Sequence, residues 1–196
     1  MLLIADSGST KTDWRVVDDA GTTINNVITE GLNPYFITQE QIALSIEEKV
    51  LPIAMDIEKV FFYGAGCGLP VKAAQVRTVL DAAFATRYPA EVSGDILGAA
   101  RSLLQDEEGI ACILGTGANS CIYNGREITD VMPSLGYMFS DWGSGTVMSK
   151  DFIALLLQEK LPAAIIDDFH ETYRIGRAQI LDSVYNQPLP NRFLAS

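Results

Sequence analysis

Two short turns rich in glycine and threonine, each directly after an apolar run, constrain the fold of this chain most strongly. The first turn, residues 6–12, follows Leu2–Ala5, and the second turn, residues 115–119, follows Ile110–Leu114. Each apolar run is predicted to be a buried strand, and β-rich residues follow each turn. Small residues let backbone N–H groups come close to an anion. The repeated pattern therefore predicts two turns that bind phosphates of one ligand.

The residues of the two turns supply the groups that such a ligand needs. Hydroxyl groups, backbone amides and one ammonium group make up the phosphate-binding candidates, which are Gly8, Ser9, Thr10, Lys11, Thr12, Gly115, Thr116 and Gly117. The Asp6 carboxylate is suited to orient Mg²⁺, because this ion prefers carboxylate, water and phosphate oxygens. By composition alone each turn also fits an ordinary hairpin, so the presence of both turns is the informative signal.

Two common nucleotide-binding fingerprints are absent from the sequence. Lys11 has no G-x-x-x-x-G ahead of it, so the first turn is not a P-loop. The glycine-rich stretch Gly64–Gly68 has Leu69 where a dinucleotide fingerprint needs its third glycine. The sequence therefore disfavours nicotinamide and flavin cofactors.

Charge and composition limit the partners of this chain. Its 196 residues carry a net charge of −11, which disfavours nucleic acid and a basic membrane-binding face. Apolar residues make up 48% of the chain, but no run approaches the roughly 18 residues of a membrane-spanning helix. Cys67, Cys112 and Cys121 have no metal-binding spacing and are expected to be buried free thiols. We expect a cytoplasmic protein without membrane or nucleic-acid partners.

The order of predicted elements is typical of two mixed α/β lobes. The order β-β-β-α-β-α-β-α precedes a polar break at residues 105–109, and β-β-β-α follows it. We expect an N-terminal lobe at residues 1–107. Residues 108–196 are expected to form the first part of a C-terminal lobe, with a nucleotide in the cleft between the two lobes.

Local signals support this order of elements. Thr38 and Gln41 form a capping box before an amphipathic helix, and Pro70 suits the first turn of the next helix. Residues 88–92 are predicted to be a short strand, and Asn124–Gly125 marks a hairpin. The last quarter of the chain is predicted to be mostly helical. Its core candidates are Phe152, Leu155, Leu156, Ile165, Ile180 and Val184.

Three motifs, in the same order, resemble those of a known family. They are residues 6–14 (DSGSTKTDW), 113–120 (ILGTGANS) and 136–145 (GYMFSDWGSG). Together they resemble the BadF/BadG/BcrA/BcrD ATPase group. Within that group they are most similar to N-acetylglucosamine kinases, members of the actin-like, sugar-kinase and Hsp70 ATPase superfamily. The resemblance covers the whole chain and is more specific for the family than for the sugar.

The resemblance implies a fold and a set of site residues. It implies a ribonuclease-H-like lobe on each side of an ATP cleft, with the two turns as phosphate loops. The catalytic base would be the aspartate that opens the helix before the second turn, here Asp95. The sugar-binding residues would be Asn33, Asn119 and Asp141. Trp142 stands where the family has glutamate, so the contacts made from that position are open.

The chemistry of these side chains agrees with the implied roles. Phosphoryl transfer to a sugar hydroxyl needs alignment, charge neutralisation and a carboxylate that accepts the proton. Asp95 follows Gly94 at a predicted helix start, where the helix dipole favours an ionised carboxylate, although a helix-starting aspartate of no catalytic role would look the same. Turn formation also explains Asn33 before Pro34. Trp142 either stacks on a sugar or packs in the interior, with packing the stronger expectation.

The length of the chain leads to a further expectation. Members of the family continue with an adenosine-binding glycine-rich segment, and nothing after Gly145 resembles it. We therefore expect that this chain is the front portion of a longer enzyme. We also expect that residues 1–196 alone bind ATP poorly.

The leading interpretation is an ATP- and Mg²⁺-dependent kinase that phosphorylates an amino sugar, N-acetylglucosamine first and glucosamine second. One alternative is an ATPase activator of a 2-hydroxyacyl-CoA or benzoyl-CoA-type radical enzyme, with an iron–sulfur cluster between subunits. Another is a sugar sensor that binds without transfer. The sequence leaves open the hexosamine, the hydroxyl attacked, the adenosine-binding residues and the oligomeric state, for which a homodimer is one option.

Overall fold

The computed structural model describes residues 1–196, and its contacts divide the chain into two compact units. The first unit comprises Met1–Ala111 and Ile122–Thr129, and the second comprises Cys112–Cys121 and Asp130–Ser196. The division lies close to the expected lobe boundary at residue 107, with residues 122–129 returning to the first unit. The lobe boundaries themselves stay a prediction.

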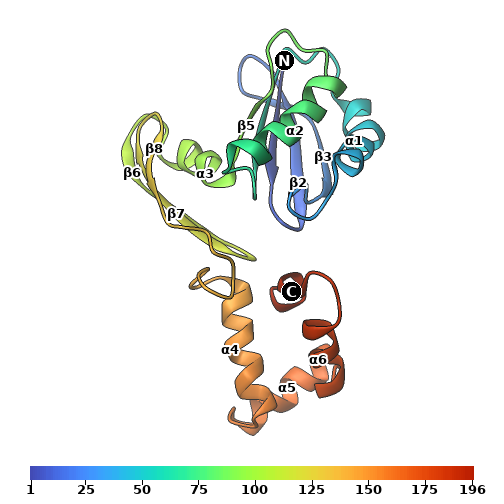
Figure 1. Ribbon diagram of the computed structural model, residues 1–196, viewed down its shortest axis with the longest axis vertical. Coiled ribbons are helices and arrows are strands. Elements are labelled where there is room, and N and C mark those ends of the chain that lie inside the picture. The colour runs from blue at the N-terminus through green and yellow to red at the C-terminus, as the bar shows by residue number, and fades with distance from the viewer. The chain divides into compact units, whose positions relative to one another are not determined.

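Five strands form the sheet of the first unit, in the spatial order β3-β2-β1-β4-β5 (Figure 1). They are β1 (Leu2–Ser7), β2 (Lys11–Val17), β3 (Thr23–Glu30), β4 (Lys59–Gly64) and β5 (Glu91–Gly94). β2 is antiparallel to both of its neighbours, whereas β4 is parallel to β1 and β5. The carboxyl ends of β1, β3, β4 and β5 therefore lie at one edge of the sheet.

Helices complete the first unit. They are α1 (Gln39–Ser45), which continues through a π-helical turn (Ile46–Val50) and a 3-10 turn (Leu51–Ile53), then α2 (Pro70–Ala83) and α3 (Asp95–Leu104). The predicted capping box is confirmed, because the Thr38 hydroxyl accepts from the Gln41 amide and the Gln41 side chain accepts from the Thr38 amide. Pro70 opens α2 as predicted.

The core of the first unit joins the sheet to α1 and α2. Trp14 and Phe62 are fully buried, with ring centroids 5.8 Å apart. Around them pack the apolar faces of the two helices, which include Ile42, Val76 and Leu80. This core fixes the strands whose carboxyl ends form the edge described above.

The predicted strand at residues 88–92 begins later than expected, at Glu91. The reason is that the backbone amide and carbonyl of Ala90 make hydrogen bonds to side chains of α2 and not to a neighbouring strand. Its amide donates to the Asp81 carboxylate at 2.7 Å, and its carbonyl accepts from the Arg77 guanidinium at 3.0 Å. Pairing with β4 therefore starts only at Glu91, opposite Phe61.

The second sheet has three strands in the order β6-β7-β8, followed by four helices (Figure 1). The strands are β6 (Glu108–Leu114), β7 (Ala118–Asn124) and β8 (Ile128–Val131). The helices are α4 (Gly145–Leu157), α5 (Ala163–Tyr173), α6 (Arg177–Tyr185) and α7 (Pro190–Leu194). The hairpin predicted at Asn124–Gly125 is confirmed, with Gly125 at φ 86°. None of the helices combines the length and the apolar character that a membrane span requires.

Several burial predictions are wrong in the second half of the chain. Leu156 and Ile180 are buried as predicted, but Leu155 and Ile165 are each 43% exposed, because only one face of each helix packs inward. Val184 and Phe152 are half-buried.

The strand predicted to be buried before the second turn is largely exposed on one side. Ile110, Cys112 and Leu114 are exposed, whereas Ala111 is buried, since alternate strand residues face opposite sides of a sheet. The expectation of buried thiols is therefore confirmed for Cys67 and Cys121 and wrong for Cys112.

Candidate functional site

The carboxyl edge of the first sheet gathers three of the predicted site residues. Asp6 lies near the end of β1, Asn33 follows β3, and Asp95 follows β5 as the first residue of α3. The register aligns Ser7 with Gly64 and Gly64 with Gly94 across three parallel strands. Ligands of open α/β sheets bind outside the carboxyl ends of the strands. The edge is therefore the candidate site of the first unit.

The first turn, residues 6–12, is a tight connection between β1 and β2. The Gly8 amide donates to the Lys11 carbonyl at 2.9 Å, which closes the turn. Thr10 and Lys11 are exposed, and Gly8 and Ser9 are partly exposed, so these four residues are accessible to an anion. Thr12 is different, because it is fully buried and its hydroxyl donates to the Glu30 carbonyl at 2.9 Å.

Asn33 lies in a short loop, residues 31–36, that packs against two other segments of this edge. Its side-chain oxygen accepts from the Tyr35 amide at 3.0 Å. A Cβ atom on Gly66 would lie 2.4 Å from that oxygen, and Gly66 has φ 83°, so only glycine fits there. The Lys72 ammonium group donates to the Pro34 carbonyl at 2.8 Å and holds the other side of the loop.

Asp95 is a partly buried carboxylate at the start of α3. Burial raises its pKa, a hydrogen bond of 3.0 Å from the Ile96 amide opposes this, and the charge of Asp6 raises it further. Burial and the Asp95 carboxylate together raise the pKa of the Cys67 thiol to about 12, so this thiol stays neutral. Asp95 is thus a carboxylate with a raised proton affinity, as a general base requires.

Asp6 has the electrostatic surroundings of a cation ligand. Burial and the neighbouring Asp13 raise its pKa, and the charges of Lys11 and Arg15 partly oppose the rise. The charge of Asp6 contributes to the raised pKa of Asp95, so the two carboxylates lie within electrostatic range of each other. No group of three or more His, Cys, Asp or Glu side chains is arranged to hold a metal ion alone. One carboxylate beside a phosphate turn fits Mg²⁺, which retains waters and binds phosphate oxygens.

The second turn, residues 115–119, is fixed against the start of α4. The Gly145 amide donates to the Gly115 carbonyl at 2.9 Å, and both the amide and the hydroxyl of Thr146 donate to the Thr116 carbonyl. Within the turn the Gly115 amide donates to the Gly117 carbonyl at 2.9 Å. The amides of Thr116 and Gly117 make no backbone hydrogen bond, so two donors are available for an anion.

Asp141 and Asn119 lie beside this second turn. A Cβ atom on Gly117 would lie 3.1 Å from an Asp141 carboxylate oxygen, so Asp141 and the turn are in close contact. Asp141 has φ 60°, a left-handed conformation that is costly for a non-glycine residue. The Asn119 side chain accepts from the Ser120 amide at 2.8 Å. Trp142 is 74% exposed, so the stronger expectation, that it packs in the interior, is wrong for this structure.

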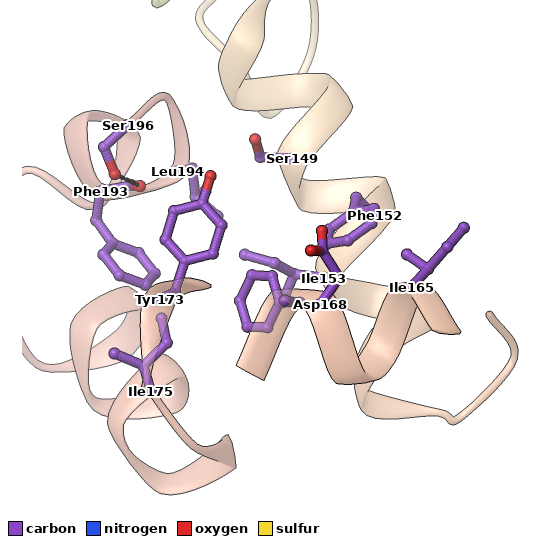
Figure 2. A pocket seen from close by; sticks show the side chains of 11 residues that line it. Ser149, Phe152, Ile153, Ile165, Asp168, Tyr173, Ile175, Phe193, Leu194 and Ser196 are labelled. Carbon is purple, nitrogen blue, oxygen red and sulfur yellow. Dashed lines mark hydrogen bonds between the residues drawn. The ribbon is translucent and has the colours of Figure 1, made fainter. Parts of the chain in front are cut away.

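A cavity of about 270 Å³ lies among the helices of the second unit, between α4, α5 and α7 (Figure 2). Aromatic and aliphatic side chains line it, including Phe152, Ile153 and Phe193. Its only charged lining side chain is the Asp168 carboxylate, and no lysine or arginine faces it. A negatively charged apolar cavity does not suit phosphate, so the cavity is distinct from the candidate phosphate site.

Sequence reasoning missed several residues that build the first unit's site. Gly66 and Lys72 carry no local signal of function, and Ser7 lies in the first turn but has no role predicted for it, because the contacts of all three depend on partners far away in the sequence. The glycine-rich stretch at residues 64–68 lacks the dinucleotide fingerprint, but its Gly66 packs directly against the Asn33 side chain. Only the pairing of strands across the sheet brings these residues together.

Comparisons with known proteins give matches among solved structures. No protein-family model matches the sequence, and no curated protein matches it. A protein from Porphyromonas gingivalis, provisionally named an N-acetylglucosamine kinase, is 45% identical in sequence. The match covers 100% of this chain and 70% of that one, with a TM-score of 0.94.

Two more distant structures share the fold. One, provisionally named an N-acetylglucosamine kinase, is from Chromobacterium violaceum, with 17% identity, coverage of 99% and 71%, and a TM-score of 0.69. The other, provisionally named an N-acetylmannosamine kinase, is from Listeria monocytogenes, with 16% identity, coverage of 98% and 73%, and a TM-score of 0.58. At these identities the two matches support the mixed α/β fold alone. The first match, with 45% identity over the whole chain, also shows that this chain and the Porphyromonas gingivalis protein are related.

Proposed function

The chain belongs to the N-acetylglucosamine kinase-like sugar kinases of the actin-like ATPase superfamily, and on this premise we propose that it phosphorylates N-acetylglucosamine with ATP. Glucosamine is the second candidate acceptor. The observation that carries the proposal is the 45% identity, over the whole chain, to a protein provisionally named for that activity. The chemistry of the two candidate sites supports it.

We propose that the two turns bind the phosphates of ATP. In the first turn the accessible groups are those of Ser9, Thr10 and Lys11, and Gly8 closes the turn through its amide. In the second turn the unpaired amides of Thr116 and Gly117 serve the same purpose, with Gly115 shaping the turn. Asp6 would hold Mg²⁺ through one carboxylate, and the ion would neutralise charge on the phosphate oxygens. Because the net charge is −11, these local donors must supply what a general positive field does not.

The sugar-binding groups in this proposal are Asn33, Asn119 and Asp141. Their side chains offer both donors and acceptors, as sugar hydroxyls and an acetamide group require. Asn33 is buried and held by the Tyr35 amide, so its orientation is preset before a ligand binds. Preset polar groups reduce the entropic cost of binding and improve discrimination among sugars.

Asp95 is proposed to be the catalytic base. The acceptor hydroxyl attacks the γ-phosphorus in line, the bond from phosphorus to the bridging oxygen of ADP breaks, and the hydroxyl proton passes to the Asp95 carboxylate. A raised pKa makes the carboxylate a better proton acceptor, provided that it is ionised at the working pH. No observation favours the activator of a radical enzyme or the sugar sensor over this reaction.

The test is a coupled assay of ADP release from the purified protein against a panel of hexoses and amino sugars. We expect ADP release that depends on both Mg²⁺ and sugar, with the highest kcat/KM for N-acetylglucosamine. Preference for a sugar without an amino group would contradict the proposed substrate. ADP release that is independent of every sugar would contradict a kinase.

A further inference from the structure

A buried row of hydroxyl groups joins the first turn to the loop that carries Asn33. Ser7 ends β1, and its hydroxyl lies 2.8 Å from the hydroxyl of Thr12, which pairs with it on β2. The Thr12 hydroxyl donates to the Glu30 carbonyl at 2.9 Å, and the Leu32 amide donates to the Ser7 hydroxyl at 3.1 Å. Ser7 and Thr12 are both fully buried. We call this pair of side chains the hydroxyl row.

The hydrogen bonds of the hydroxyl row have a fixed direction. Each hydroxyl has one proton to donate. Thr12 gives its proton to the Glu30 carbonyl, so Ser7 must be the donor in the bond between the two hydroxyls. The chain of donation therefore runs from the Leu32 amide through Ser7 and Thr12 to the Glu30 carbonyl. Loss of either hydroxyl leaves a buried donor without its acceptor, which is costly.

Backbone contacts connect the same two segments. The Gly31 amide donates to the Thr10 carbonyl at 2.9 Å. A Cβ atom on Gly31 would lie 2.5 Å from the Gly8 carbonyl oxygen and 2.6 Å from that of Ser9, so the loop rests directly on the backbone of the turn. Hydrogen bonds to the first turn are therefore made both by Glu30, just before Gly31, and by Leu32, just after it.

We propose that Ser7 and Thr12 are positioning residues, which hold the Asn33 loop, and with it the sugar, in a fixed place relative to the ATP phosphates. This inference rests on the proposed function and gives Thr12 a role other than direct phosphate contact. In-line transfer requires the reacting atoms within about 3–3.5 Å and correctly aligned, so a small shift of the loop is costly. Neither residue touches solvent, so neither acts on a ligand directly.

The test compares three variants of the whole protein. Thr12→Val keeps the shape of the side chain but removes the donor to Glu30 and the acceptor for Ser7. Thr12→Ser keeps the hydroxyl. Thr29→Val is the matched control, because Thr29 is buried, accepts from the Trp14 indole at 3.1 Å and donates to the same Glu30 carbonyl at 3.2 Å. No hydrogen bond joins the Thr29 side chain to the first turn.

Two readouts are measured for each variant. The first is KM for N-acetylglucosamine and for ATP. In Thr12→Val we expect KM for the sugar to rise about tenfold, the size expected from an unsatisfied buried donor, with KM for ATP unchanged. Thr12→Ser and Thr29→Val should retain the sugar KM of the wild type. A rise in KM for ATP instead would make Thr12 a phosphate contact, and equal effects in Thr12→Val and Thr29→Val would reduce it to a stabilising residue.

The second readout, amide hydrogen exchange at Leu32, does not depend on activity. We expect exchange at Leu32 to be faster in Thr12→Val than in Thr29→Val. Ser7→Ala, which removes the acceptor of the Leu32 amide directly, replaces Thr12→Val if that variant does not fold. Unchanged exchange at Leu32 would overturn the inference. Wild-type protein inactive on every sugar would overturn the proposed function, and the exchange result would still decide whether the hydroxyl row holds the loop.

Discussion

At the scale of single residues, the proposed chemistry depends on two carboxylates at one sheet edge. Asp6 and Asp95 both have raised pKa values, each mainly because of burial, and the charge of Asp6 contributes to the rise at Asp95. A bound Mg²⁺ at Asp6 would offset that repulsion. This would favour the ionised form of Asp95, the form that accepts the proton of the sugar hydroxyl.

Replacing Asp95 by asparagine tests its role as the base. Asparagine keeps the shape and the hydrogen-bonding oxygen but cannot accept the hydroxyl proton. We expect Asp95→Asn to lower kcat by about a hundredfold or more, as for loss of a general base, with sugar affinity close to that of the wild type. Steady-state kinetics and sugar titration give both quantities. A kcat near that of the wild type would exclude Asp95 as the base.

The same substitution should make the protein more stable at neutral pH. Because the pKa of Asp95 is higher in the folded than in the unfolded state, the folded protein binds the proton more tightly. The stability that the protonated carboxyl provides is complete below the ordinary aspartate pKa of about 3.9 and is lost as the pH rises through the raised folded pKa. Thermal unfolding at pH 7 should show a higher Tm for Asp95→Asn than for the wild type. An equal or lower Tm would contradict the idea that burying the ionised Asp95 carboxylate costs free energy of folding.

At the scale of elements, the position of Asp95 depends on how α3 packs on β4. A Cβ atom on Gly98 would lie 2.8 Å from Cγ of Tyr63, so α3 approaches the sheet closely at this glycine. The Arg101 guanidinium donates to the Tyr63 hydroxyl at 2.8 Å and to the Glu91 carboxylate at 2.7 Å. These bonds keep the Tyr63 ring from moving aside.

Gly98→Ala should therefore displace the start of α3. We expect a loss of about 1–3 kcal/mol in the free energy of unfolding, as for overpacking, together with a lower kcat. Denaturant unfolding and kinetics measure the two effects. Gly68→Ala is the stability control, because a Cβ atom there meets nothing within 4 Å. Combining Gly98→Ala with Tyr63→Leu should recover part of the loss, and an additive further loss would show that the ring is not the obstacle.

Elements with local signals were predictable from the sequence, whereas others were not. The capping box at Thr38 and the hairpin glycine Gly125 depend on neighbouring residues only, and both were confirmed. The start of β5 depends on Asp81 and Arg77 of α2, which take the hydrogen bonds of Ala90, and no local pattern shows this. Burial on β6 was likewise misjudged at Ile110 and Leu114, because an apolar run does not tell which face is covered.

In the candidate site, too, features set by neighbouring residues were predictable, and features set by distant partners were not. The sequence places Asp95 at a helix start and Asp6 directly before a turn of small residues, and the structure has both residues at these positions. The role of Asp95 as the base is implied only by the family resemblance and stays a proposal. The hydroxyl row was not predictable, since Ser7 and Thr12 gain their roles only through pairing across β1 and β2 and contact with the Asn33 loop. Their roles follow from the three-dimensional hydrogen-bond network alone.

At the scale of the whole molecule, the candidate groups are divided between the two units. The first turn, Asn33 and Asp95 belong to the first unit, and the second turn, Asn119 and Asp141 belong to the second. Each unit by itself offers donors for phosphate and polar groups for a sugar. Our account requires one nucleotide to contact both turns at once.

Amide hydrogen exchange with and without Mg²⁺ and a non-hydrolysable ATP analogue tests this requirement most directly. The analogue should occupy the backbone donors of both turns, so we predict slower exchange in peptides that cover residues 7–12 and in peptides that cover residues 115–119. Both changes should appear at the same analogue concentration, because one ligand causes them. Protection of a single turn, or half-maximal protection of the two turns at clearly different concentrations, would contradict the account.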